Sequence, residues 1–279
     1  MQCYWHFCST LAKIRVTMKE ITGEELKKIQ VEILDDVVMF CQRHELRYFL
    51  AYGTLLGAVR HNGYIPWDDD IDIHMPRPDY EKFIELYNKE QDCNRVVSPE
   101  IDKRYRTAFA KVYRKGTVVR EFHFKPDVFG VYIDIFPLDG LKDRKQAQRC
   151  GEIRRYMHVK NSVFTSGMSL LRKMRLAVTK TILLPFSINA LQRRIKSIAT
   201  ECNYNECEYV YSSYSRLAAK EQFPREMFDN YRMVVFEGKE YRAPQDYDLY
   251  LHTLYGDYMK RPPEDKRVST HNSQAYHIE

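Results

Sequence analysis

The stretch PWDDDIDIHMP, Pro66 to Pro76, places four aspartates in five consecutive positions and alternates the last two with isoleucine. Side chains alternate between the two faces of a strand, so Asp68, Asp70 and Asp72 share one face if the strand begins that early. The isoleucines then face the core, and the carboxylates repel one another on a half-buried surface. A divalent cation relieves that repulsion, and hard oxygen ligands select Mg²⁺ or Mn²⁺. The stretch therefore predicts a metal site, with a solvated turn before an ordinary edge strand as the alternative.

A further aspartate, Asp134, lies between isoleucines in the stretch YIDIF, Tyr132 to Phe136. A lone buried carboxylate is costly unless it is paired or bound to a metal. If its strand lies beside the first one, Asp134 completes a set of three carboxylates. The alternative is an aspartate that caps a neighbouring loop.

Gly53 and Thr54 follow a short predicted strand and open a short predicted helix. The free backbone N–H groups at such a helix start, together with the helix dipole, favour a bound anion. In chain order, the sequence thus has a strand, a Gly-Thr helix start, an Asp-x-Asp strand and a later single aspartate. This order indicates phosphoryl-transfer chemistry.

The composition is that of a folded globular protein, with 279 residues, 44% of them hydrophobic and 29% charged. Helices and strands mix in the first half, which predicts an α+β catalytic part followed by a mainly helical C-terminal half. The expected strands span 47–52, 71–74, parts of 105–121 around Lys115-Gly116, 131–140, and a hairpin around 237–239; the expected helices span 21–46, 54–63, 76–89, most of 142–202, and 245–255. Thr22 and Glu25 predict a capping box for the first helix.

Positive charge is concentrated between Ile153 and Thr200, which holds ten Lys and Arg residues and no Asp or Glu, although the whole chain carries only +6. A local excess of this kind suits phosphates. The apolar residues mixed into it allow peripheral contact with an anionic membrane through residues 153–200. The alternative is an amphipathic helix packed on the core with a solvated basic face. Nucleic acid is not the expected partner, because the segment has few aromatic residues for base stacking.

The seven cysteines are scattered, odd in number and without a CxxC pair, which favours reduced thiols in a cytosol. Cys202 and Cys207 are spaced like half a zinc site, but no second pair has ligand spacing. No run of about 18 apolar residues predicts a spanning helix. Residues 1–17 are interpreted as an extension outside the fold, with Met18 as the functional start.

Three blocks of the sequence resemble the LicD family, which includes bacterial phosphocholine transferases and is distantly similar to the fukutin-related ribitol-phosphate transferases. The blocks are YGTLLGAVRHNGYIPWDDDIDIHMPRPDYEKF (Tyr52 to Phe83), FGVYIDIFPLDG (Phe129 to Gly140) and YLHTLYGDYMKRPPEDKR (Tyr250 to Arg267). The similarity extends from about Met18 to His271. The long first block is the most specific of the three.

The resemblance implies a nucleotidyltransferase-like mixed sheet with flanking helices. Residue by residue, Gly53 and Thr54 match the family's helix start, Asp70 and Asp72 its metal pair, and Asp134 its third carboxylate. It also implies transfer of a phospho-alcohol from a CDP-alcohol, with CDP-choline favoured, to a sugar hydroxyl of a cell-surface glycan precursor. Such acceptors are commonly lipid-linked, and CMP is released. The alternative function is nucleotidyl transfer or nuclease chemistry on nucleic acid through the same aspartates.

Other residues receive supporting roles in this reading. Arg60, His61 and Lys111 are candidates to hold phosphate oxygens, and Asp134 is the candidate to orient or deprotonate the acceptor hydroxyl. Trp67, with Tyr64, could line a choline cage through cation–π contacts, although core packing is the alternative.

The chain is therefore divided into an extension (1–17), a catalytic core (18–142), a basic helical region (143–202) and a part that completes the same domain (203–279). The expected location is the cytoplasm, with peripheral contact at the inner face of the cell membrane.

Overall fold

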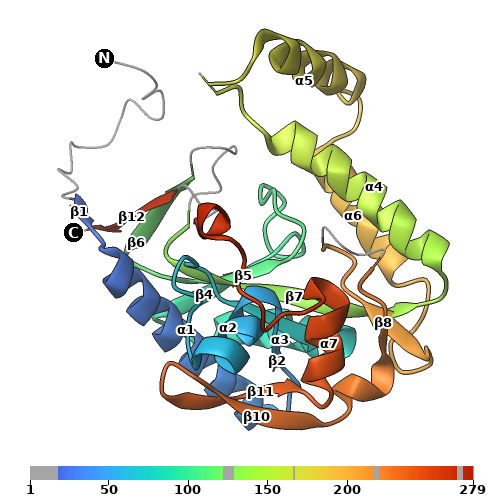
Figure 1. Cartoon of the computed structure of the whole chain (residues 1–279). Coiled ribbons are helices and arrows are strands. Elements are labelled where there is room, and N and C mark those ends of the chain that lie inside the picture. Colours follow the sequence, from blue (N-terminus) through green and yellow to red (C-terminus); the bar gives the residue numbers. More distant parts are fainter. Residues whose placement is uncertain (1–17, 122–128, 166, 216–219, 269–272, 279) are drawn as a thin grey trace.

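The computed structural model describes residues 18–121, 129–165, 167–215, 220–268 and 273–278, so the extension expected at residues 1–17 lies outside the described chain. Helices and strands are mixed along the chain (Figure 1), which confirms the α+β class. The helices are α1 (Gly23–Arg43), α2 (Tyr52–His61), α3 (Arg77–Glu90), α4 (Arg144–Asn161), α5 (Leu170–Ile182), α6 (Ile188–Ala199) and α7 (Tyr247–Tyr255). The strands are β1 (Met18–Glu20), β2 (Phe49–Leu50), β3 (Asp72–Pro76), β4 (Asn94–Val97), β5 (Ala110–Arg114), β6 (Thr117–Glu121), β7 (Tyr132–Leu141), β8 (Tyr209–Tyr211), β9 (Phe223–Pro224), β10 (Tyr231–Phe236), β11 (Lys239–Pro244) and β12 (Ser273–Ile278).

The central sheet has the strand order β2-β3-β7-β5-β4, and β8 and β9 continue it from the far end of β7. Strands β3 and β7 are parallel, whereas the other pairs in this sheet are antiparallel. A second sheet has the order β1-β12-β6, and β10 and β11 form the expected hairpin. Strand β12 lies between β1 and β6, so the C-terminal strand pairs with strands from the first half of the chain (Figure 1).

Helix α1 begins as the sequence predicts. The Thr22 side chain accepts a hydrogen bond from the backbone N–H of Glu25 at 3.2 Å. The Glu25 carboxylate itself contacts Nε2 of His277 at 2.8 Å, so it links α1 to β12. The apolar side of α1 is buried in the main core and consists of Ile29, Ile33, Val37, Phe40 and Cys41.

The aspartate-rich stretch forms a turn before it becomes a strand. The backbone N–H of Asp68 donates to the carbonyl oxygen of Ile65 at 2.8 Å, with Pro66 at the second position of the turn, where its fixed φ is favoured. Strand β3 begins only at Asp72. Asp68 and Asp70 therefore precede the strand. They do not share a strand face with Asp72, as they would if the strand began earlier.

Strand β7 continues through Pro137, which lies inside it and does not end it. The antiparallel neighbour β5 stops at the pair Ala110–Ile135, and β8 begins at the pair Asp139–Tyr211. Pro137 lies in the gap between these two neighbours, where its missing N–H breaks no antiparallel ladder.

The basic region folds as helices, of which α4 and α6 pack against each other and against β7. They bury a second, smaller cluster of apolar residues beside the main core. From Tyr209 onward the chain returns mostly to strands, so the expectation of a mainly helical second half holds only for Arg144–Ala199.

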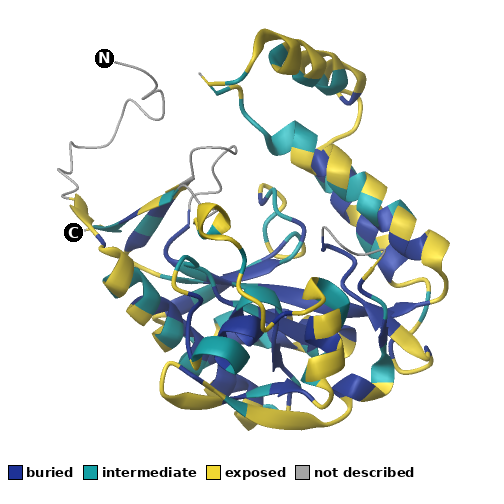
Figure 2. Cartoon of the chain, in the orientation of Figure 1, coloured by how far each residue is buried: buried dark blue, intermediate teal, exposed yellow. Residues whose placement is uncertain are grey.

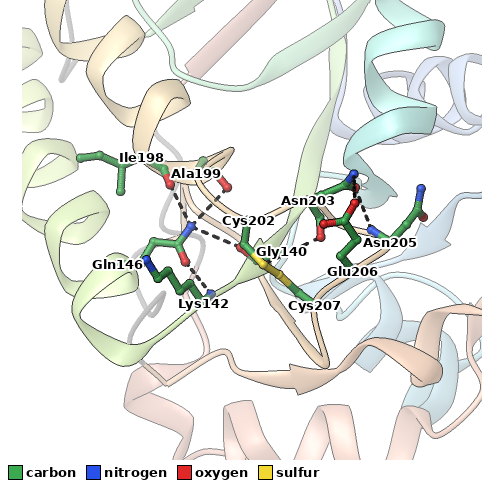
Figure 3. The surroundings of a disulfide bond; sticks show 10 residues. All are labelled: Gly140, Lys142, Gln146, Ile198, Ala199, Cys202, Asn203, Asn205, Glu206 and Cys207. Carbon is green, nitrogen blue, oxygen red and sulfur yellow. Dashed lines mark hydrogen bonds between the residues drawn. A yellow bond between two sulfur atoms is a disulfide. The ribbon is translucent and has the colours of Figure 1, made fainter.

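The loop after α6 contains a disulfide between Cys202 and Cys207 (Figure 3). The two Cα atoms are 6.4 Å apart, within the range that disulfides span. The loop lies directly over Gly140 of β7, where an added Cβ would lie 2.9 Å from Sγ of Cys207. The expectation of reduced thiols is thus wrong for this pair, while the free cysteines in the described residues are Cys41, Cys93 and Cys150.

Buried residues concentrate in the central sheet and on the helix sides that face it, whereas α5 carries exposed and partly exposed residues almost throughout (Figure 2). Among the described residues, none of the helices combines the length and the apolar character needed to cross a bilayer.

Candidate active site

One row of the central sheet brings three of the predicted residues together. In the parallel pair β3–β7, Asp72 lies opposite Asp134, and in the antiparallel pair β5–β7, Lys111 lies opposite Asp134 from the other side. Residues that pair across neighbouring strands project from the same face of a sheet. Strand register therefore places the three residues in one row of charged side chains, in the spatial order Asp72–Asp134–Lys111.

Lys111 and Asp134 form a close ion pair. Nζ of Lys111 lies 2.5 Å from Oδ1 of Asp134, and the two side chains are only 7% and 13% exposed. The same ammonium group lies 3.4 Å from the ring centroid of Tyr132. The ammonium group of Lys111 thus pairs with Asp134, and a part for Lys111 in holding phosphate stays a prediction.

The start of α2 lies beside this row. Oγ1 of Thr54 accepts a hydrogen bond from the backbone N–H of Asp72 at 2.8 Å, which fixes the beginning of β3 against the helix. A Cβ added to Gly53 would lie 2.6 Å from Oδ2 of Asp68. Asp68 thus lies close to the helix start where an anion site was predicted, and a side chain at residue 53 would require the Asp68 carboxylate to move.

Gln30 of α1 holds the loop of aspartates against β7. Its Nε2 donates to the carbonyl oxygens of Asp69 at 2.9 Å and Tyr132 at 3.2 Å. Its Oε1 accepts a hydrogen bond from the hydroxyl of Tyr64 at 2.9 Å. Tyr64 is 9% exposed and packs on Phe236, so its role is structural, as the core-packing alternative proposed.

Crowding of carboxylates is the main electrostatic feature of the site. Desolvation, followed by the negative charges of Asp70, Asp134 and Asp68, raises the pKa of Asp72 well above its ordinary value. Within the described ranges, no three His, Cys, Asp or Glu side chains converge closely enough to form a ready ligand set. The donor chemistry nevertheless fits a hard divalent cation, because all four groups are carboxylates and a cation would relieve their repulsion.

A group of cations lies at the other end of α2. Arg60 donates through NH1 to the carbonyl oxygen of Tyr258 at 2.7 Å and through Nε to Nε2 of His61 at 3.1 Å. Desolvation and the nearby charges of Arg60 and Arg261 lower the pKa of His61, so this imidazole is neutral at pH 7. Arg60, His61 and Arg261 are hereafter called the basic cluster.

Tyr255, at the end of α7, lies near both Arg60 and the carboxylates. The residue as a whole is 41% exposed, but desolvation of its hydroxyl, followed by the charges of Asp72 and Glu221, raises its pKa. Its neutral hydroxyl is therefore near acidic and basic groups at once.

A family model described as LicD/FKTN/FKRP, nucleotidyltransferase domain, matches residues 45–186 of the chain, a range that contains every predicted site residue. The chain belongs to the LicD family. The resemblance seen in the three sequence blocks is thereby confirmed.

The relatives of this LicD-family chain differ in how much of it they cover. The lipopolysaccharide cholinephosphotransferase LicD of Haemophilus influenzae is 29% identical over 267 residues, which are 93% of this chain and 99% of that protein. An uncharacterized protein of Rickettsia prowazekii is 34% identical over 79 residues, or 28% of this chain and 29% of that protein. The similarity to the Haemophilus protein therefore covers most of this chain and nearly all of that protein.

Within this LicD-family site, the sequence reasoning missed Glu221. This side chain is 1% exposed, accepts a hydrogen bond from the hydroxyl of Tyr52 at 2.9 Å, and accepts another from the hydroxyl of Ser215. The hydroxyl of Tyr250 joins the same region, because it accepts from the backbone N–H of Tyr52 at 3.2 Å and contacts Nε2 of His74 at 3.0 Å. A single Glu in a polar tail gives no local signal, since its burial arises only from tertiary packing.

Trp67 lies beside His61 of the basic cluster. It is half-buried, its ring centroid is 6.4 Å from that of His61, and the guanidinium carbon of Arg267 lies 5.8 Å from its ring centroid. One face of the indole is thus already in contact with a cation. A place for Trp67 in a choline cage stays a prediction.

Glu221→Gln is expected to change how stability depends on pH. Burial raises the pKa of Glu221 from 4.5 to about 7, against the opposing hydrogen bonds from Ser215 and Tyr52. Between these two pH values the folded chain keeps a proton that the unfolded chain has released, so the free energy of unfolding falls as pH rises. At pH 8 this penalty is on the order of 3 kcal/mol, and the Gln variant lacks it.

The measurement is urea unfolding of both proteins at pH 5, 6, 7 and 8. The difference in unfolding free energy should shift in favour of the variant as pH rises from 5 to about 7 and then level off. Parallel curves for the two proteins would show that Glu221 does not titrate in this range.

Proposed function

We propose that this LicD-family chain transfers phosphocholine from CDP-choline to a sugar hydroxyl of a lipopolysaccharide-type or related cell-surface glycan, and releases CMP. The observation that carries the proposal is the row in which Asp72 and Asp134 stand side by side next to the Gly53–Thr54 helix start. The name of the Haemophilus relative, which matches 93% of this chain, supports both the phosphocholine group and the glycan acceptor. We place the reaction in the cytoplasm, where nucleotide-activated donors are available.

Asp70, Asp72 and Asp134 are the residues proposed to hold Mg²⁺ or Mn²⁺. When bound, the metal would neutralise charge on the donor diphosphate and on the leaving CMP. Asp72 is held in place by its own backbone hydrogen bond to Thr54 and by pairing with β7. The protein thus supplies two carboxylates on strands, Asp72 and Asp134, and a third, Asp70, from the loop before β3. A bound cation would relieve their mutual repulsion.

The basic cluster is proposed to bind the phosphate oxygens that point away from the carboxylates. Arg60 is fixed by its hydrogen bond to the Tyr258 carbonyl, so its guanidinium is held in one orientation before the donor arrives. An anionic phosphate would favour protonation of His61, whose pKa is lowered in the donor-free chain. Tyr255 lies near Arg60 and near the carboxylates, and it would contact the diphosphate.

Asp134 is proposed to orient the acceptor hydroxyl and to accept its proton. In the transfer, the acceptor oxygen forms a bond to the phosphorus of phosphocholine, the bond from that phosphorus to the CMP oxygen breaks, and the proton passes to the carboxylate. Lys111, which lies 2.5 Å from Asp134, would hold that carboxylate in position.

Calorimetric titration with CDP-choline and CDP-ribitol, each with and without Mg²⁺, tests the donor. We expect binding of CDP-choline that depends on Mg²⁺ and is reduced at least about tenfold in Asp70→Asn. A matched control is Asp92→Asn, which removes the same charge from a side chain that is 100% exposed. CDP-ribitol binding in place of CDP-choline would move the proposal to another phospho-alcohol. If neither donor binds, the CDP-alcohol proposal fails and oligonucleotides are the next ligands to titrate.

A further inference from the structure

Helix α5 projects from the end of α4, away from the central sheet (Figure 1). None of its residues is buried, although more than half of them are apolar. A helix of this composition in a globular domain normally turns its apolar side to the core. The orientation of α5 therefore needs an explanation.

The exposed side of α5 is its apolar side. Large side chains on this side recur at helical spacing. They are Leu170, Leu171, Met174, Val178 and Ile182, which are 75%, 60%, 58%, 60% and 67% exposed. We call these five residues the apolar stripe.

The side of α5 that faces α4 is polar by comparison. Nζ of Lys180 donates to the carbonyl oxygen of Ser162, just beyond the end of α4. In the opposite direction, Nζ of Lys160 on α4 donates to the carbonyl oxygen of Leu183 at 2.6 Å. Hydrogen bonds from lysine side chains to backbone carbonyl oxygens thus hold α5, while its apolar stripe faces solvent. This arrangement contradicts the alternative in which the helix packs on the core with a solvated basic face.

We infer that α5 lies on an anionic lipid surface, with the apolar stripe inserted between the headgroups. Charge complementarity identifies this occupant: Arg172 and Arg175 are exposed on the same helix, and no Asp or Glu occurs between Ile153 and Thr200. An interfacial helix combines such an apolar side with flanking cations that attract anionic headgroups. The inference does not depend on the transferase chemistry proposed above, since it needs neither donor nor acceptor.

Flotation of the full chain with lipid vesicles tests the inference. We expect binding to phosphatidylcholine vesicles that contain about 30% phosphatidylglycerol, with much weaker binding to phosphatidylcholine alone. Met174→Asp should weaken binding at least about tenfold, because it puts a charge into the apolar stripe. Met39→Asp is a matched control, because Met39 lies on α1 and both methionines are 58% exposed. The double variant Arg172→Gln/Arg175→Gln should lose about tenfold on the anionic vesicles only.

Three outcomes would overturn the inference. The chain would fail to float with anionic vesicles, or Met174→Asp and Met39→Asp would weaken binding equally. In the third outcome, sedimentation without lipid would show a dimer that Met174→Asp dissociates, which would assign the apolar stripe to a second copy of the chain. Donor calorimetry on Met174→Asp shows whether the variant keeps its fold, and a membrane result of either sign leaves the transferase proposal as it stands.

Discussion

Asn in place of Asp72 is expected to reduce phosphocholine transfer by about 10³-fold or more while leaving the fold intact or slightly more stable. The loss follows from removing a proposed metal ligand and with it the charge stabilisation of the leaving CMP. The stability effect follows from the raised pKa of Asp72, because burial and the neighbouring carboxylates make its ionised form unfavourable in the folded chain. An uncharged amide at residue 72 removes the cost of burying this ionised carboxylate. A gain in stability with a loss of activity is expected for a residue that is kept for function.

CMP release from CDP-choline in the presence of a glycan acceptor measures the first effect, and urea unfolding at pH 7 measures the second. Asp92→Asn again serves as the control for loss of one negative charge, since its carboxylate is 100% exposed. Loss of activity together with a lower unfolding free energy would give Asp72 a structural role. Retained activity would remove Asp72 from the chemistry altogether.

The carboxylate row could be predicted from sequence because it depends on local rules. Isoleucines on both sides of Asp72 and Asp134 indicate strands with one polar position each, and the family resemblance places those strands in one site. The register that sets the two aspartates opposite each other needs the structure. The contact of Asp134 with Lys111 also needs the structure. Strand β5, which carries Lys111, pairs with β4 and β7, whereas β6, the next strand in the chain, pairs with β12 in another sheet.

The remaining site residues could not be predicted, because tertiary packing alone brings them there. Arg261 and Tyr255 belong to the third block that resembles the LicD family, but nothing in that block indicates that they lie near Arg60, about 200 residues earlier in the chain. Glu221 is buried by contacts with Tyr52 and Ser215 that no periodicity foretells. The disulfide escaped prediction for a similar reason, because an odd, scattered set of cysteines does not show which two a loop will bring together.

Asp139→Ala is expected to lower the free energy of unfolding by about 3–5 kcal/mol, because it leaves a buried guanidinium without its counterion. Nε of Arg77 lies 2.6 Å from Oδ1 of Asp139, and NH2 lies 3.0 Å from Oδ2. The hydroxyl of Ser213 donates to the same carboxylate at 2.5 Å. The Arg77 and Asp139 side chains are only 8% and 0% exposed, so little water is available to replace the lost pairing.

Urea unfolding measures this loss, and Glu85→Gln is the matched control. Glu85 forms an ion pair with Lys89 at 3.4 Å, but the two side chains are 72% and 62% exposed. Removing an exposed pair should cost no more than about 0.5 kcal/mol. Equal losses for the two variants would show that burial does not govern the strength of the Arg77–Asp139 pair.

The double variant Arg77→Met/Asp139→Leu separates the stability of the pair from its positional role. Replacing a buried ion pair by apolar residues of similar volume is often nearly neutral, so the double variant should be more stable than Asp139→Ala. Arg77 follows directly on β3 and Asp139 lies on β7, one residue past the last pair of the β3–β7 ladder, Pro76–Leu138. If the ion pair also fixes this ladder, the double variant should fold yet bind CDP-choline more weakly than wild type, because Asp72 and Asp134 share the same register. Unchanged donor binding would show that the ion pair contributes to stability alone. If the double variant lost as much unfolding free energy as the two single variants together, the two charges would not be coupled.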